Sequence, residues 1–115
     1  MWFMPRDYKI YLKDILESIA KIDEYTKGVS FAEFKEERMR EDAIIRNLMT
    51  IGEAVKSIPG TIRSKSPQTE WEEMAGLRDI LVHQYFGIEL GTIWDIIKKD
   101  LPRLKRDIEK LIEKL

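Results

Sequence analysis

Apolar residues recur every three or four positions along almost the whole chain, and this spacing limits the fold more than any other feature of the sequence. Each apolar stripe marks one face of a helix that must be buried against other helices. The stripes predict four helical regions, which cover about residues 8–27, 30–58, 71–87 and 89–115. No alternating pattern of useful length indicates a β-strand. We therefore expect an all-α protein, built as an up-and-down four-helix bundle.

Local signals refine the ends of these helices. Ser30, with Glu33 three residues later, predicts a capping box that opens the second helix, and Thr69 with Glu72 predicts another before the third. Pro102 lies inside the last helix and should kink it or break one hydrogen bond.

Two stretches carry a weaker helical pattern. Residues 36–42 are highly polar, so the second helix is expected to be kinked or frayed there. Residues 60–69 form the only long connection, with at most one turn of helix at residues 61–64.

The composition excludes several classes of function. The 115 residues fit a single domain, residues 1–115, with 20 basic and 21 acidic side chains. This balance argues against sequence-blind wrapping of nucleic acid, but it leaves room for a small cationic site that acts on RNA. The absence of cysteine excludes thiolate metal sites, and a single histidine argues against zinc. No apolar run is long enough to span a membrane, so we expect a cytoplasmic protein.

The stretch 76–87 holds the residues best suited to chemistry. It contains Arg78, the only histidine (His83) and Tyr85. Taken singly, each residue has a structural explanation: a surface salt bridge of Arg78 with a neighbour such as Asp79, capping of a helix end by His83, and core packing of Tyr85. Together they combine a fixed cation, a group that titrates near neutrality and a phenol, which indicates phosphate chemistry.

The spacing within this stretch sets geometric conditions on a site. Asp79 and His83 are four residues apart, so they share a helix face and the carboxylate can orient the imidazole. Arg78 and His83 are five residues apart, which separates them by about 140° around a regular helix. Either the helix loosens near Val82, or the two residues line opposite walls of a cleft.

Cleavage of RNA without a metal requires a base, an acid and a fixed cation. The 2′-hydroxyl must lose a proton as it attacks the phosphate, and the 5′-oxygen must gain one as it leaves. Arg78 suits the cation and His83 suits the proton transfers, but each chain has only one histidine. A two-fold dimer supplies the second copy. We therefore predict that a monomer is inactive and that the site lies at or beside the seam of a homodimer.

The order Arg, four residues, His, one residue, Tyr resembles the motif of the HEPN superfamily, and within it the HepT-type toxins of HepT/MntA toxin–antitoxin pairs. The similarity extends over nearly the whole chain. It includes Asp7-Tyr8, residues 22–26 with Gly28, Arg46-Asn47-Leu48, Ile51-Gly52-Glu53-Ala54, residues 71–76, Phe86-Gly87 and residues 94–102.

This resemblance implies an all-α HEPN domain that dimerises and acts as a metal-independent endoribonuclease toxin, without a cofactor. Arg78 and His83 match the catalytic pair, and Asp79 matches the polar position that follows the arginine. Tyr85 matches the tyrosine that the partner MntA, a minimal nucleotidyltransferase and the antitoxin, adenylylates. Added AMP would bring negative charge and bulk beside the site and so repel an RNA phosphate. Asn47 is either a residue that supports the site or a buried amide that sets the helix register.

Two other functions stay open on the sequence. The chain could be a non-catalytic helical dimer that binds a nucleotide or docks a nucleotidyltransferase, or it could be a structural bundle. RNA is the expected substrate, and no role with DNA or at a membrane is expected.

Overall fold

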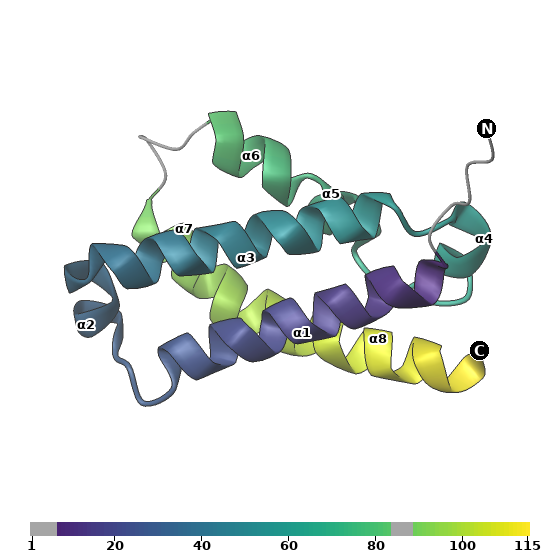
Figure 1. Cartoon of the computed structure of the whole chain (residues 1–115), viewed down its shortest axis with the longest axis horizontal. Helices are drawn as coiled ribbons and strands as arrows, with labels where there is room; N and C mark the ends of the chain where they lie inside the picture. The colour runs from purple at the N-terminus through teal and green to yellow at the C-terminus, as the bar shows by residue number, and fades with distance from the viewer. Residues whose placement is uncertain (1–6, 84–88) are drawn as a thin grey trace.

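Helices are the only regular secondary structure in the part of the chain that the computed structural model describes, residues 7–83 and 89–115. The side chains of Ile80, Val82 and His83 lie outside this description. The helical regions run alternately in opposite directions along the long axis of the molecule (Figure 1). The prediction of an all-α, up-and-down bundle is therefore confirmed.

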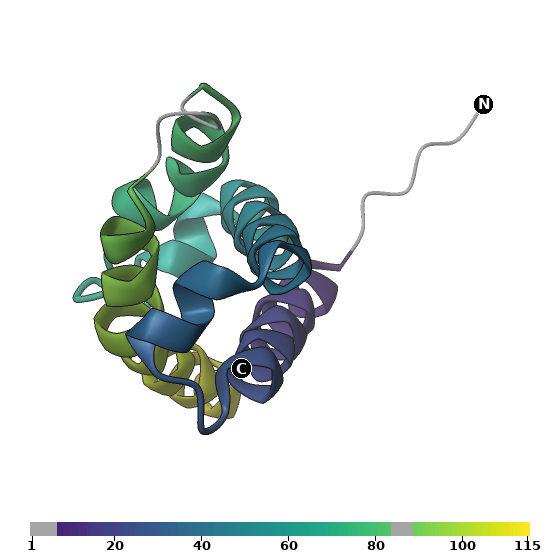
Figure 2. The same cartoon turned by 90° about the vertical axis from the view of Figure 1, so that its left-hand side faces the viewer.

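The first two long helices form the central pair of the bundle. Helix α1 (Tyr8–Thr26) and helix α3 (Arg38–Lys56) lie side by side along most of their length, as Figures 1 and 2 show. The short helix α2 (Phe31–Glu36) precedes α3 and is separated from it by Glu37, whose backbone is extended. This break confirms the irregularity that the polar stretch 36–42 predicts.

The capping box at Ser30 is confirmed. The Ser30 hydroxyl accepts a hydrogen bond from the Glu33 backbone N–H at 3.2 Å, and the Glu33 carboxylate accepts one from the Ser30 backbone N–H at 3.2 Å. The Ser30 backbone N–H, with a further contribution from its hydroxyl, holds the pKa of Glu33 below its ordinary value of 4.5.

The capping box predicted at Thr69 and Glu72 is wrong. Helix α5 (Trp71–Ala75) has Glu70 as its N-cap, and no side chain caps it. The Thr69 hydroxyl instead donates to the Asp107 carboxylate at 2.9 Å and lies 2.6 Å from the Ser66 hydroxyl. The Thr69 hydroxyl therefore bonds to the carboxylate of Asp107, which is distant in the sequence, and does not cap the helix as the local pattern predicts. The single turn expected near residues 61–64 is present as α4 (Gly60–Arg63).

The third helical region is divided, but not where the motif spacing suggests. Gly76 ends α5, and helix α6 (Leu77–His83) follows it directly. Helix α6 stays regular from Arg78 through Val82 to His83, so the first of the two alternatives, a loosening of the helix near Val82, is not present. The irregular point is Gly76, since glycine is a weak helix former.

The last helical region is irregular just before Pro102. It consists of helix α7 (Leu90–Asp95), a π-helical segment η1 (Ile96–Asp100) and helix α8 (Leu101–Lys114). The Leu101 N–H donates to the Ile96 carbonyl five residues back, which widens the turn where Pro102 has no N–H to offer. The irregularity predicted at Pro102 therefore takes the form of a π-helical turn.

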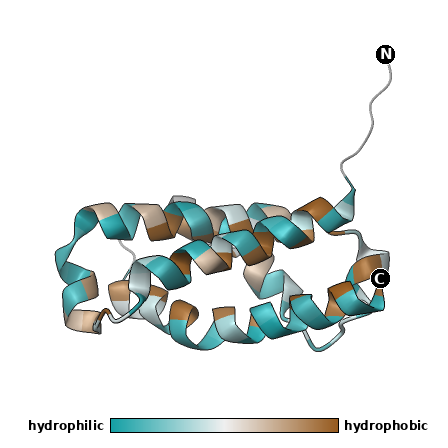
Figure 3. Cartoon of the chain, turned by 60° about the horizontal axis from the view of Figure 1, so that its bottom comes forward, coloured by the Kyte–Doolittle hydropathy of each residue, from teal (hydrophilic) through white to brown (hydrophobic). Residues whose placement is uncertain are grey.

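Apolar stripes of all these helices meet in one core, and Figure 3 shows apolar positions recurring along each helix among polar ones. Trp71 is buried and its indole N–H donates to the Ser66 carbonyl at 3.0 Å, while Trp94 is half-buried and packs on Phe34 with ring centroids 5.1 Å apart. Within the residues described, no helix combines the length and apolar character that crossing a membrane requires. The largest fully buried side chains are Phe34, Leu12, Ile15, Ile19, Ile22, Ile44, Leu48, Ile51, Leu81, Ile93, Leu101 and Ile108.

Candidate functional site

Arg78 lies where helix α6 crosses helix α3, and Gly52 makes this crossing possible. A Cβ atom at Gly52 would lie 3.0 Å from the Arg78 backbone nitrogen and 3.4 Å from both the Arg78 Cβ and the Met74 carbonyl oxygen. The two backbones can therefore approach this closely only because residue 52 has no side chain. The contact holds the backbone of Arg78 against the middle of the bundle.

Charged side chains surround the Arg78 guanidinium. Its Nε contacts the Glu53 carboxylate on α3, and its Nη1 lies 3.7 Å from Asp79 Oδ1. Asp79 Oδ1 also lies 3.4 Å from Lys56 Nζ. The side chain of Arg78 is 43% exposed and that of Glu53 is 55% exposed. Ion pairs this exposed contribute at most about 1 kcal/mol to stability, so their main effect is to orient the guanidinium.

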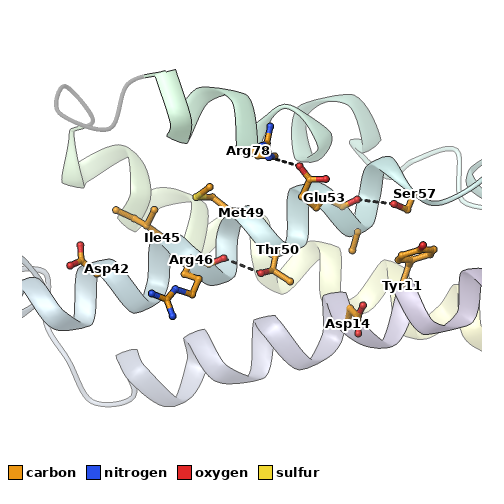
Figure 4. Close-up of a pocket in the computed structure, with 11 residues that line it drawn as sticks. Tyr11, Asp14, Asp42, Ile45, Arg46, Met49, Thr50, Glu53, Ser57 and Arg78 are labelled. Atoms are coloured by element: carbon orange, nitrogen blue, oxygen red, sulfur yellow. Dashed lines mark hydrogen bonds and ion pairs between the residues drawn. The ribbon is translucent and has the colours of Figure 1, made fainter. Parts of the chain in front are cut away.

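Arg78 and Glu53 lie at the rim of a groove of about 740 Å³. Helix α3 supplies most of its lining, Tyr11 and Asp14 of α1 lie on one side, and Arg78 of α6 lies on the other (Figure 4). Exposed Arg46 also lines it. The groove thus offers two arginines on opposite sides of a partly apolar floor.

Only part of the predicted site lies within the described residues. His83 is the last residue of α6, five positions after Arg78, but its side chain lies outside the described part of the structure. Tyr85 lies outside the described residues altogether. The described contacts of Asp79 are with Arg78 and Lys56, so its orientation of His83 stays a prediction.

Asn47 is not part of the Arg78 groove. It lines a second hollow of about 440 Å³ between α1 and α3, which shares Asp14, Arg46 and Thr50 with the first. Its Nδ2 donates to the Ala43 carbonyl at 2.9 Å, one turn earlier on the same helix. This contact favours the structural explanation of Asn47 over a role beside Arg78.

The sequence motif did not identify Glu53 and Gly52 as neighbours of Arg78, or Lys56 as a neighbour of Asp79. They lie more than 20 residues away in the chain, so no local spacing could connect them with the motif. The one available signal was a glycine inside an apolar helical pattern, which often marks a close approach of two backbones. Among the described residues, no three His, Cys, Asp or Glu side chains cluster as a metal site would need.

The fold is an all-α bundle, and it holds a half-exposed arginine at the rim of a groove, five residues before the chain's only histidine. These features are those of the class of small helical HEPN-type nucleases. Residues 15–111 match the family described as "Ribonuclease HepT-like", and the chain belongs to that family. The resemblance to HepT-type ribonucleases is therefore confirmed.

Related proteins carry ribonuclease names. The chain is 46% identical over 112 residues to the "Gamma-glutamylcyclotransferase and putative RNase" of Methanocaldococcus jannaschii, covering 97% of this chain and 50% of that protein. It is 45% identical over 104 residues to a "Putative RNase" of the same organism, covering 90% of this chain and 95% of the relative. It is 43% identical over 108 residues to the "Probable ribonuclease HepT" of Thermococcus cleftensis, covering 94% and 98%. No solved structure matches the chain.

Proposed function

We propose that this chain is an endoribonuclease that cleaves RNA without a metal ion, through Arg78 and His83 in a homodimer. Membership of a ribonuclease family supports the reaction class. The observation that carries the proposal is the half-exposed Arg78 guanidinium at the groove rim, held at Nε by Glu53. Its contact with Asp79 at 3.7 Å is too long for a hydrogen bond, so the terminal N–H groups can turn to a phosphate.

The proposed reaction needs two proton transfers and one bond exchange. A base takes the 2′-hydroxyl proton, and the 2′-oxygen forms a bond to the adjacent phosphorus. The bond from phosphorus to the 5′-oxygen breaks, and an acid protonates that oxygen, leaving a 2′,3′-cyclic phosphate and a 5′-hydroxyl. Arg78 stabilises the charge on the phosphoryl oxygens, and His83 carries the protons. Because each chain has one histidine, the second must come from another copy.

The direct test is cleavage of RNA by the purified chain in the presence of a chelator. We expect products that end in a 2′,3′-cyclic phosphate, and a loss of about 100-fold or more in His83→Ala and in Arg78→Lys, whose point charge cannot replace the planar fork. Arg103→Lys is the matched control, since Arg103 is exposed and pairs only weakly with Glu70 at 3.5 Å. Full activity of His83→Ala in chelator contradicts the proposal.

The proposal also gives the activity a cellular role. The chain acts as one domain in the cytoplasm, as the toxin of a pair whose antitoxin is an MntA-like nucleotidyltransferase. That partner adenylylates Tyr85 and so blocks the entry of RNA. The HepT family membership supports this pairing.

Co-expression of the chain with such a nucleotidyltransferase tests the control step. Tyr85→Phe should stay toxic and gain no AMP by mass spectrometry, whereas the wild-type chain is modified and silenced. Silencing of Tyr85→Phe would remove Tyr85 from the control step. Partner or nucleotide binding without any cleavage of RNA would instead favour the non-catalytic helical dimer.

A further inference from the structure

Four side chains form a row of alternating charge where α3 and α6 cross. Glu53 of α3 contacts Nε of Arg78 on α6 (Figure 4). Asp79 Oδ1 lies between two cations, 3.7 Å from Arg78 Nη1 and 3.4 Å from Lys56 Nζ. The two inner members of the row belong to α6 and the two outer ones to α3. Two negative charges are thus balanced by two positive ones.

Helical spacing explains why Lys56 reaches Asp79. Glu53 and Lys56 are three residues apart on α3, so their side chains leave the helix on the same side. Gly52 precedes Glu53 and lets the backbone of α6 come close enough for both contacts. Arg78 and Asp79 are consecutive on α6 and point about 100° apart. One of them therefore meets Glu53 and the other meets Lys56.

The two contacts of the Asp79 carboxylate are unequal. The Lys56 ammonium donates a hydrogen bond to Asp79 Oδ1 at 3.4 Å, whereas Arg78 Nη1 is too far away to do so at 3.7 Å. A guanidinium binds a carboxylate with the same planar fork that it offers to a phosphate. Asp79 and an RNA phosphate therefore compete for the terminal N–H groups of Arg78, and Lys56 holds the competitor.

Stability of the fold does not account for the contact between Lys56 and Asp79. The side chain of Lys56 is 39% exposed and that of Asp79 is 55% exposed, and solvent screens ion pairs of this kind. The charge beside Arg78 depends on the contact more strongly. Without Lys56, two carboxylates would surround one guanidinium, and the row would carry a net negative charge that repels a phosphate.

We propose that Lys56 is a positioning residue of the nuclease. It holds the Asp79 carboxylate and so keeps the terminal N–H groups of Arg78 free for an RNA phosphate. When these groups turn to the phosphate, Asp79 retains Lys56 as its counter-ion. Lys56 itself does not touch the RNA. The inference rests on the proposed function, because it concerns how Arg78 is kept ready for the phosphate.

Binding of an RNA that cannot be cleaved tests the proposal without the proton transfers. A short mixed-sequence RNA with methylated 2′-hydroxyls keeps its phosphates but lacks the attacking group. Lys56→Met removes the charge and keeps the length of the side chain, and we expect it to bind this RNA about 5-fold more weakly than the wild-type chain. Lys56→Arg keeps the cation and should bind as the wild type does. Wild-type affinity of Lys56→Met overturns the proposal.

A double-mutant cycle shows whether Lys56 acts through Asp79. In an Asp79→Asn background no carboxylate at this position competes for Arg78, so Lys56→Met should weaken binding by less than about 2-fold. An equal loss in both backgrounds would mean that Lys56 acts without Asp79, which the proposal forbids.

The salt dependence of binding gives an independent measurement. Removing a side chain that contacts one phosphate of a single strand reduces the slope of log Kd against log salt concentration by about 0.7. We expect Lys56→Met to keep the wild-type slope, because Lys56 makes no phosphate contact. A slope reduced by that amount would make Lys56 a direct RNA contact and overturn its positioning role.

Lys99→Met is the matched control. Lys99 forms an exposed ion pair with Asp95 at 3.9 Å in the last helical region, so this variant loses the same charge from another part of the molecule. It should bind RNA as the wild type does, and an equal loss in Lys99→Met would reduce the effect to net charge and overturn the proposal. Thermal melting confirms that each variant is folded.

The same measurements separate this inference from the proposed function. A wild-type chain that binds the methylated RNA but cleaves no unmodified RNA refutes the nuclease, whereas its binding still decides whether Lys56 acts through Asp79. A wild-type chain that binds no RNA overturns both.

Discussion

Replacing Gly52 with alanine should destabilise the protein, although alanine is the better helix former. The new Cβ would lie 3.0 Å from the Arg78 backbone nitrogen, whereas ordinary contacts begin at 3.4 Å. Helix α6 must therefore move by about 0.4 Å, because the obstacle is backbone and cannot rotate away.

The net effect follows from two opposing terms. Overpacking at a helix crossing costs about 1–3 kcal/mol, and replacing a mid-helix glycine with alanine returns about 1 kcal/mol. We expect a net loss of about 1 kcal/mol, with an upper limit near 2 kcal/mol. For a chain of 115 residues, this lowers the melting temperature by about 4 °C.

Urea unfolding and thermal melting measure the loss, with Gly91→Ala as the matched control. A Cβ at Gly91 would lie 3.9 Å from the nearest atom of Phe31, an ordinary contact, so that variant should lose no stability. If Gly52→Ala proves as stable as Gly91→Ala, the close approach at Gly52 does not constrain α6. The activity of Gly52→Ala should also fall at temperatures where it is fully folded, because Arg78 moves with α6.

Four further substitutions test other contacts. Ser30→Ala should lower the free energy of unfolding, measured in urea, by about 1 kcal/mol. Because the pKa of Glu33 is lowered in the folded state, the ionised Glu33 carboxylate stabilises the fold above about pH 4.5, and this contribution is lost as the pH falls through the lowered pKa. Glu33→Gln should therefore make the free energy of unfolding less dependent on pH in this acid range. Thr69→Val should cost about 1–3 kcal/mol, because it leaves two hydrogen-bonding partners unsatisfied, and an unchanged unfolding midpoint would refute that role. Glu53→Gln should reduce RNA cleavage through Arg78 while changing stability by less than about 1 kcal/mol; equal loss of both would make Glu53 a structural residue only.

The sequence alone determined the helices because burial of an apolar stripe is a local property of the chain. Leu12, Ile15 and Ile19 recur at helical spacing, and all three are buried in the structure. The cap at Ser30 was predictable for the same reason, since its partner is three residues away. The cap at Thr69 was not, because its hydroxyl bonds to Asp107, which is 38 residues away.

The same division holds at the candidate site. The motif predicts Arg78 and His83 as site residues from residue types and spacing, which need no knowledge of packing. Only the tertiary structure placed Glu53 beside the Arg78 guanidinium and Gly52 against the Arg78 backbone, since these contacts arise where α3 and α6 cross. Local periodicity says which face of a helix is buried, but it carries no information on which helix lies against that face, at what level, or with which side chains.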